Sequence, residues 1–128
     1  MSSKAPQHRA VWFEIPATDL TRAMTFYSTI LETDFHVETM GEAHMAIFAR
    51  TQDDAVNGCL LLAPHSTPSA TGTVVYLNAG DDLSLALGRV VPAGGAVVVP
   101  KTAIGADRGF FAVFSDTEGN TVGLYSQH

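Results

Sequence analysis

Residues 11–31 read VWFEIPATDLTRAMTFYSTIL, and this stretch decides the fold. Over residues 11–16 apolar side chains alternate with other side chains, which is the period of two expected of a strand with one buried face. Trp12 and Glu14 therefore share one face of the predicted strand. The opposite face is available to be covered by the segment that follows.

The second part of this stretch predicts an amphipathic helix. Apolar residues recur with helical spacing from Leu20 to Leu31. Thr18 or Asp19 can cap the helix, because either side chain can accept hydrogen bonds from the first free N–H groups.

The composition indicates a single globular domain. The chain has 128 residues, of which 46% are hydrophobic and 16% are charged, and this is enough apolar chain to build a core. The formal net charge is −6 and there is no basic run, so neither nucleic acid nor an anionic membrane surface is an expected partner. No apolar run approaches the length of a membrane span.

The N-terminal segment and the cysteine content bear on the compartment. Residues 1–9 carry Lys4 and Arg9 without an apolar segment, so we expect a disordered tail rather than a secretory signal. The single cysteine, Cys59, cannot form a disulfide within the chain, which fits a reducing compartment. The resulting expectations are a cytoplasmic location and a buried free thiol at Cys59.

Two series of elements are predicted, one on each side of a linker. After the first helix, strands are expected at residues 34–39, 43–49 and 58–63, before the linker-like stretch HSTPSATG at 65–72. Beyond the linker we expect a strand at 73–79, a helix opened by Asp81 and Asp82 and ended by Pro92, strands at 96–99, 109–115 and 121–127, and a loop at 100–108.

The two halves of the chain repeat one order of elements, strand–helix–strand–strand–strand. Asp19-Leu20 and Asp82-Leu83 hold equivalent places in the two halves. Such an internal duplication predicts an α+β fold built of two βαβββ units. One domain, residues 10–128, is expected to contain units at about 10–64 and 72–127 with the linker at 65–71.

Two local motifs add a family resemblance. The first helix contains Phe26-Tyr27, and the chain closes on a D-x-x-G-N-x-x-x-L segment made of Asp116, Gly119, Asn120 and Leu124. With the duplicated βαβββ order, these motifs resemble the vicinal oxygen chelate superfamily, which includes glyoxalase I, bleomycin resistance proteins and extradiol dioxygenases. The resemblance implies a glyoxalase-like fold in which the two units curl into half-barrels around a cavity, and it implies a homodimer.

The resemblance also implies where a metal site would lie. Metal-dependent members place His, Gln or Glu ligands on the first and last strands of each half. In this sequence those positions fall at Trp12, at Cys59 to Leu62, at Thr73 or Val74, and at Gly123. A divalent ion needs about three or four converging oxygen or nitrogen donors. No metal ligand and no cofactor are therefore predicted, unless an atypical set such as Glu14 with His44 binds a divalent metal.

Glu14 is the candidate catalytic residue. It lies two residues beyond Trp12, the vacated ligand position, and should point into the cavity as well. There it can act as a general base or accept a hydrogen bond from a ligand. The alternative is a structural role, as a solvated carboxylate at the cavity mouth or as the partner of an arginine.

Aromatic and polar residues supply the candidate lining of the cavity. Tyr76 and Asn78 share one face of the fifth strand, and Tyr125 shares the face of Gly123 on the last strand. These side chains either line a site for a planar ligand or belong to a small core with satisfied hydroxyls. His44, on a middle strand, either lines the cavity or lies at the surface.

These residues lead to two functional hypotheses. The first is a small-molecule binding protein that holds an apolar or aromatic ligand against Trp12, Phe48, Tyr76, Phe111 and Tyr125 without a metal. The second is an enzyme of the same fold, a lyase, isomerase or dioxygenase-like protein, with Glu14 as base or with an atypical metal site. A vestigial cavity in an interaction domain is the third alternative. Binding is the preferred hypothesis.

Overall fold

The computed structural model describes residues 7–50, 52–53 and 55–128. Its elements run in the order β1 (Trp12–Pro16), α1 (Leu20–Leu31), β2 (Phe35–Met40), β3 (Ala43–Phe48), β4 (Asn57–Leu62), β5 (Tyr76–Asn78), α2 (Leu83–Val90), β6 (Ala96–Ala103), β7 (Phe110–Ser115) and β8 (Thr121–Ser126). The fold is α+β, and each half of the chain forms a βαβββ module. This confirms the prediction made from the repeated order of elements.

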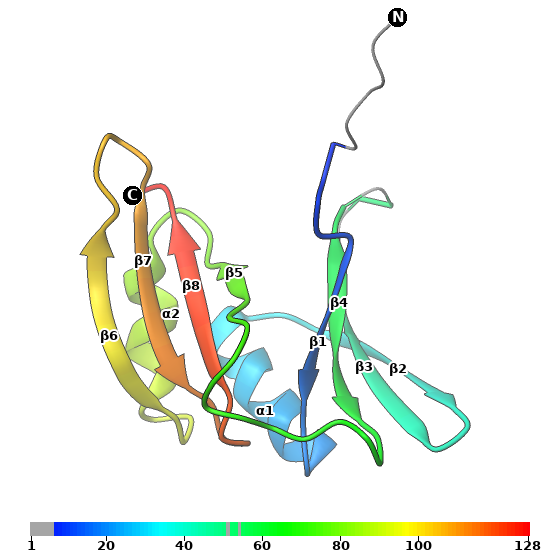
Figure 1. Cartoon of the computed structure of the whole chain (residues 1–128). Helices are drawn as coiled ribbons and strands as arrows, with labels where there is room; N and C mark the ends of the chain where they lie inside the picture. Colours follow the sequence, from blue (N-terminus) through cyan, green and yellow to red (C-terminus); the bar gives the residue numbers. More distant parts are fainter. Residues whose placement is uncertain (1–6, 51, 54) are drawn as a thin grey trace, which may run out of the picture.

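Each module folds into its own four-stranded mixed sheet. The strand order is β1-β4-β3-β2 in module 1 and β5-β8-β7-β6 in module 2. In both sheets the first strand lies parallel to the last strand, and the remaining pairs are antiparallel. Figure 1 shows the two sheets on either side of α1, with β1 and β5 as the strands of each sheet nearest the other module.

The two helices begin on equivalent residues. Asp19 is the N-cap of α1 and accepts a hydrogen bond from the backbone N–H of Arg22 at 3.0 Å. Asp82 is the N-cap of α2 and accepts one from Ser84 at 2.9 Å. The predicted equivalence of the two Asp-Leu pairs is therefore present in the structure, and each aspartate satisfies a helix N–H group that has no partner within the helix.

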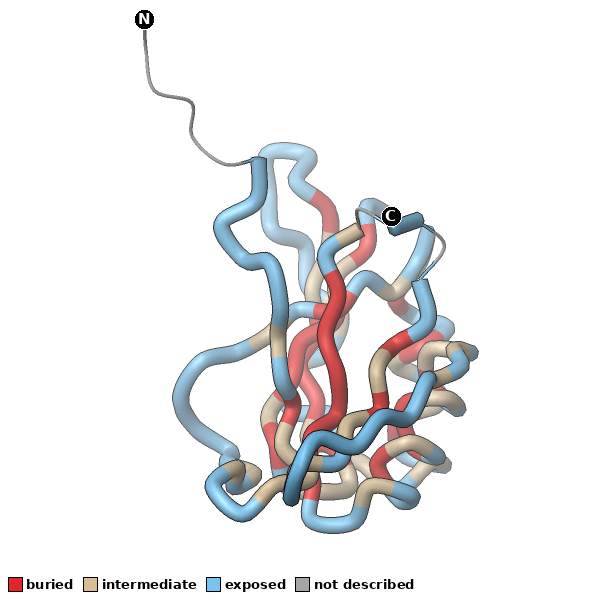
Figure 2. Tube along the Cα trace, turned by 90° about the vertical axis from the view of Figure 1, so that its right-hand side faces the viewer, coloured by how far each residue is buried: buried red, intermediate tan, exposed pale blue. Residues whose placement is uncertain are grey.

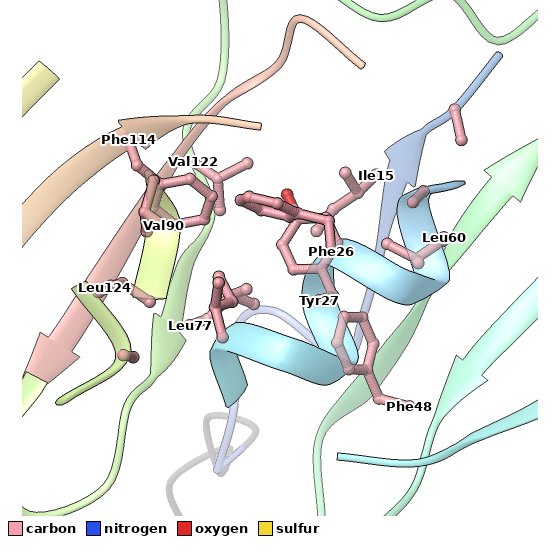
Figure 3. Packing of buried hydrophobic residues seen from close by; sticks show 14 of the residues in the cluster. Ile15, Phe26, Tyr27, Phe48, Leu60, Leu77, Val90, Phe114, Val122 and Leu124 are labelled. Carbon is pink, nitrogen blue, oxygen red and sulfur yellow. The ribbon is translucent and has the colours of Figure 1, made fainter. Parts of the chain in front are cut away.

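The core is shared by the two modules and centres on α1. Figure 3 shows Phe26 and Tyr27 of α1 between the apolar side chains of the two sheets. Phe26 lies 5.7 Å from Phe114 of module 2, and Tyr27 lies 6.2 Å from Phe48 of module 1, measured between ring centroids. Burial of one such side chain stabilises the fold by about 1.5–3 kcal/mol. Figure 2 shows this buried interior as central red strand segments between exposed loops.

Two strands, β5 and β6, differ from the sequence prediction by more than one residue at a boundary. β6 continues through Pro100 to Ala103, where a loop was predicted, because β6 is an edge strand on which proline need not donate a hydrogen bond. Register shifts on either side of Val99 accommodate it. β5 is shorter than predicted and begins at Tyr76 rather than Thr73.

The linker between the modules is anchored to β8. The backbone N–H of Ser69 donates to Oδ1 of Asn120 at 3.2 Å, and the Thr121 hydroxyl donates to the carbonyl of Ala70 at 2.9 Å. Of the predicted tail, residues 1–6 lie outside the described residues and residues 7–9 are exposed. Within the described part of the chain, neither helix has the length and apolarity needed to cross a membrane.

Candidate functional site

A cavity of about 880 Å³ is lined by residues from the first strands of both modules, β1 and β5. Trp12, Phe13 and Glu14 contribute from β1, and Tyr76, Leu77 and Asn78 contribute from β5. The cavity also reaches Phe48 of the aromatic cluster in module 1, whose ring lies 5.7 Å from that of Phe13. A site of this size with apolar walls and few polar groups suits a small organic molecule.

Five of the eight residues predicted from the sequence line this cavity, namely Trp12, Glu14, Phe48, Tyr76 and Asn78. The other three, His44, Phe111 and Tyr125, are not among its lining residues. The sequence interpretation therefore identified both strands that form the walls.

Trp12 and Glu14 lie on one face of β1, as the alternation predicted. The Trp12 indole N–H points to Oε2 of Glu14 at a long distance of 3.4 Å, and both side chains are exposed. Trp12 retains 44% of its surface exposure. A ligand can therefore reach both the indole ring and the carboxylate without moving the backbone.

Cys59 lies beside Glu14 in the sheet but offers no reactive thiolate. The two residues are partners in the parallel β1–β4 pair, and Cys59 is fully buried. Burial, and then the charge of Glu14, raise the pKa of the Cys59 thiol to about 11. The thiol is therefore neutral at physiological pH, which confirms the predicted buried free cysteine.

Tyr76 forms an aromatic wall that depends on a glycine. It is the register partner of Gly123 on β8, and a Cβ atom at that glycine would overlap the Tyr76 ring. The ring therefore lies across the β8 backbone and meets Phe111 edge-on at 6.2 Å. Tyr76 nevertheless keeps 51% of its surface exposed, so much of the ring remains available to a ligand.

The Tyr125 hydroxyl and the amide oxygen of Asn78 already have hydrogen-bond partners. The Tyr125 hydroxyl donates to the carbonyl of Arg108 at 2.7 Å and lies 3.0 Å from Oε1 of Gln127. Oδ1 of Asn78 accepts a hydrogen bond from the backbone N–H of Gly80 at 2.9 Å. For Tyr125, the alternative of a satisfied structural hydroxyl describes the geometry.

His44 lies on the opposite face of the module 1 sheet from Glu14. Residues opposite each other on neighbouring strands share a face; Glu14 pairs with Cys59, whereas His44 pairs with Leu62. Cys59 and Leu62 are three positions apart on β4 and so point to opposite faces. The ring of His44 is exposed, with Nδ1 3.2 Å from the Thr39 hydroxyl. The atypical metal set of Glu14 and His44 is therefore not brought together.

The family's metal positions do not offer a ligand set either. Trp12 and Cys59 supply an indole and a buried neutral thiol, and Gly123 is covered by the Tyr76 ring. Within residues 7–50, 52–53 and 55–128, no group of three or more His, Cys, Asp or Glu side chains is placed to hold a metal ion. The residues present do not fit the divalent ion of metal-dependent relatives.

Eight apolar lining residues were not predicted as site residues, among them Phe13, Leu31 and Leu77. The alternation along β1 assigned Phe13 to the core, and Leu31 ends the apolar stripe of α1. They reach the cavity because it lies where the two modules meet. No local sequence pattern predicts how two sheets are placed relative to each other.

Comparison with known proteins agrees with this architecture. The family model of the Glyoxalase/Bleomycin resistance protein/Dioxygenase superfamily matches residues 9–124. A relative from Didymella fabae, described as a glyoxylase-like domain-containing protein, is 32% identical over 111 residues, covering 84% of this chain and 85% of the relative.

Solved structures show the same fold. Glyoxalase I from Zea mays superposes with a TM-score of 0.67 at 18% identity, over 91% of this chain and 45% of the maize enzyme, so the chain spans about half the length of that protein. TnmS3, an antibiotic binding protein from a Streptomyces species, superposes with a TM-score of 0.62 at 25% identity, over 97% of this chain and 98% of TnmS3.

Proposed function

Because the chain belongs to the glyoxalase/bleomycin resistance protein/dioxygenase superfamily, we propose that it binds an apolar or aromatic small molecule in the cavity between β1 and β5. The superfamily includes both enzymes and binding proteins, so the fold alone does not distinguish these two functions. The choice rests on the residues of the cavity.

One observation carries the proposal: a cavity of about 880 Å³ has aromatic walls on both sides, with Trp12 and Phe13 on one module and Tyr76 on the other. Aromatic side chains provide large contact areas and stack favourably on planar ligands. The donor set for a divalent ion does not form among the described residues. The near full-length likeness to TnmS3, an antibiotic binding protein, supports a binding role.

Fluorescence titration with 1-aminoanthracene, a neutral polycyclic aromatic probe, tests the proposal. We expect saturable probe emission together with quenching of Trp12, the single tryptophan of the chain. Tyr76→Ala should weaken binding about three- to tenfold, because it removes one aromatic wall. The control is Val98→Ala, which shortens an exposed apolar side chain on β6. An unsaturable signal, or equal affinity for Tyr76→Ala and the parent chain, contradicts the proposal.

An enzymatic function is the second candidate, and the position of Glu14 supports it. Its carboxylate is the one charged group among the described cavity-lining residues, and a carboxylate beside a bound carbon acid can abstract a proton. The test is exchange of ligand protons with D₂O, followed by NMR for molecules found by ligand screening. Exchange that the parent chain catalyses and Glu14→Gln abolishes favours catalysis; saturable binding without exchange favours the binding protein.

We further propose that the protein is a homodimer, as the family resemblance implies. Large apolar side chains outside the lining of this cavity, among them Met40 and Leu85, are exposed, and a second copy would shield such side chains from water. Light scattering coupled to size-exclusion chromatography measures the mass directly. A monomeric mass across micromolar concentrations rules the dimer out and leaves the binding proposal intact.

A further inference from the structure

A second, smaller cavity of about 150 Å³ adjoins the first one. It lies between the end of β1, the linker and the beginning of β8. The linker hydrogen bonds from Ser69 and to Ala70 hold its outer wall against β8. Because these contacts join segments about 50 residues apart in sequence, the small cavity is part of the folded architecture.

The two cavities are contiguous. Glu14, Thr73 and Val75 line both of them. A single molecule can therefore occupy the large cavity with one part and extend past Glu14 into the small cavity with another.

The two cavities differ in chemistry. The walls of the large one are mainly aromatic and aliphatic, whereas the small one is lined by five hydroxyl side chains and an amide, those of Thr67, Ser69, Thr71, Thr73, Thr121 and Asn120. Within the described part of the chain, the hydroxyls of Thr67 and Thr73 have no hydrogen-bond partner, whereas the Thr121 hydroxyl donates to Ala70. Free hydroxyls can donate to and accept from a hydroxylated ligand.

Glu14 lines both cavities, and its negative charge favours a positively charged group of a ligand at this position. It is the one charged side chain among the described residues that line the two cavities. Its single hydrogen bond, from the Trp12 indole, is long at 3.4 Å, and no cationic side chain lies in either lining. A ligand cation at this position gains a charge-assisted hydrogen bond and can also contact the face of the Trp12 ring.

We propose that the ligand is amphiphilic and cationic, with an apolar aromatic body in the large cavity and an amine on a hydroxylated arm that contacts Glu14 and enters the small cavity. This assignment rests on the proposed binding function and adds the ligand class to it. An anionic arm is excluded by the same geometry, because the carboxylate would repel it without a compensating cation.

Three related probes separate the parts of this proposal. Daunorubicin combines a planar aromatic body with a hydroxylated amino sugar; N-acetyldaunorubicin keeps that shape without the charge; daunomycinone, the aglycone, keeps the aromatic body alone. Affinities are measured on the full chain by isothermal titration calorimetry, which does not depend on Trp12 emission. We expect daunorubicin to bind about tenfold or more tightly than its N-acetyl derivative, because one charge-assisted hydrogen bond is lost.

Variants identify the residues responsible. Glu14→Gln should remove the preference for the amine while leaving daunomycinone affinity within about twofold, since the aromatic body contacts other residues. Thr73→Val, which preserves side-chain shape, should weaken daunorubicin about three- to tenfold. Glu42→Gln removes an equal charge from the exposed β2–β3 turn, outside both cavities, and controls for attraction of a cation to an acidic protein.

The outcomes distinguish the two proposals. If all three probes bind equally and Glu14→Gln changes nothing, the amine assignment is overturned and the aromatic binding site stands. If Glu42→Gln lowers daunorubicin affinity as much as Glu14→Gln, the preference is general electrostatic attraction and the assignment is overturned as well. If none of the probes and no 1-aminoanthracene binds, both proposals fail. Circular dichroism and thermal unfolding of each variant verify that the fold is retained.

Discussion

The first turns of the two helices are built on equivalent aspartates but are stabilised in different ways. At α1, the carboxylate of Glu118, from the β7–β8 turn, accepts hydrogen bonds from the backbone N–H groups of Thr18 and Asp19 at 2.9 Å each, and its side chain is fully buried. At α2, the side chain of Asp82 keeps 48% of its exposure and pairs with Lys101 at 2.9 Å.

The difference lies in where the partners come from. Glu118 is separated from Thr18 by 100 positions and belongs to the other module. Lys101 of β6 and Ser126 of β8, which bond Asp82 and the backbone of Leu83, belong to the same module as α2. The start of α1 is thus an inter-module contact, whereas the start of α2 is completed by its own module. A duplicated pattern of elements does not imply duplicated stabilisation.

Removing Asp116 should have the largest effect, because this residue holds the turn that carries Glu118. Its buried carboxylate accepts hydrogen bonds from the Tyr27 hydroxyl at 2.7 Å and from the backbone N–H groups of Glu118 and Asn120. Asp116→Ala leaves these donors unsatisfied in the interior, so we expect a loss of about 3–5 kcal/mol in the free energy of unfolding. Urea unfolding measures it.

The matched control for that variant is Asp81→Ala, which removes an exposed aspartate close to α2. It should change the free energy of unfolding by less than about 0.5 kcal/mol. Equal losses in the two variants would mean that the β7–β8 turn does not stabilise the junction of the modules.

Replacing Glu118 should have an intermediate effect. Arg22 Nε donates to Oε2 of Glu118 at 2.7 Å, in addition to the two backbone donors at the start of α1. Glu118→Gln keeps the shape but loses the charge, so we expect a decrease of about 1–3 kcal/mol near neutral pH. Thermal and urea unfolding of the variant, beside those of Asp116→Ala, rank the two contributions.

The contribution of Glu118 should also depend on pH. Burial raises the pKa of Glu118, but hydrogen bonds from Arg22, Asp19 and Thr18 outweigh burial and lower the value to about 2, below its ordinary value of 4.5. The folded pKa is depressed, so the stabilisation is fully present above about pH 4.5 and is lost as the pH falls through about 2. The stability gap between the parent chain and Glu118→Gln should narrow over this interval. A constant gap would contradict a role for the ionised carboxylate.

Replacing Asp82 should have the smallest effect. Asparagine is as good an N-cap as aspartate, so Asp82→Asn removes only the charge of the pair with Lys101. The two side chains keep 48% and 26% of their exposure, and an ion pair this accessible to solvent contributes little. We expect the melting temperature to change less than in Glu118→Gln. Lys101→Met, tested in parallel, separates the ion pair from the contact of the Lys101 ammonium with the Phe110 ring, at 4.6 Å. A melting temperature as low as that of Glu118→Gln would show that the two helix starts are equivalent after all.

Local signals in the sequence predicted most of the secondary structure. Period-two alternation identified β1, and the Asp-Leu pairs located both helix starts, because these features depend on residues a few positions apart. The predicted bounds of β5 and β6 were wrong, because hydrogen bonding to the neighbouring strand decides where these two strands begin and end. Val74 has the character of a strand but precedes the first contact with β8, which the Val75 carbonyl makes by accepting a hydrogen bond from Gly123 at 2.8 Å. Pro100 is tolerated because its strand lies at a sheet edge.

The site was less predictable than the fold. Alternation showed which residues share a strand face, and the family resemblance indicated which face lines a cavity; Trp12, Glu14 and Tyr76, predicted in this way, all line it. Leu31 could not be predicted as a lining residue, because its place in the lining depends on how the two modules meet. The role of Glu118 could not be predicted either, since nothing in the local sequence DTEGN distinguishes it from a solvated turn residue.

The contact between Glu118 and the start of α1 also bears on how the chain folds during synthesis. When module 1 leaves the ribosome, Glu118 and Asn120 have not yet been synthesised. The N–H groups of Thr18 and Asp19 then lack the Glu118 carboxylate, and the carbonyl of Pro16 lacks the Asn120 amide that donates to it at 2.7 Å. The contacts at the start of the helix that forms the centre of the core are therefore completed only after residues 118–120 of module 2 have emerged. Contacts so distant in sequence slow folding, and they make the two halves one cooperative unit despite their repeated architecture.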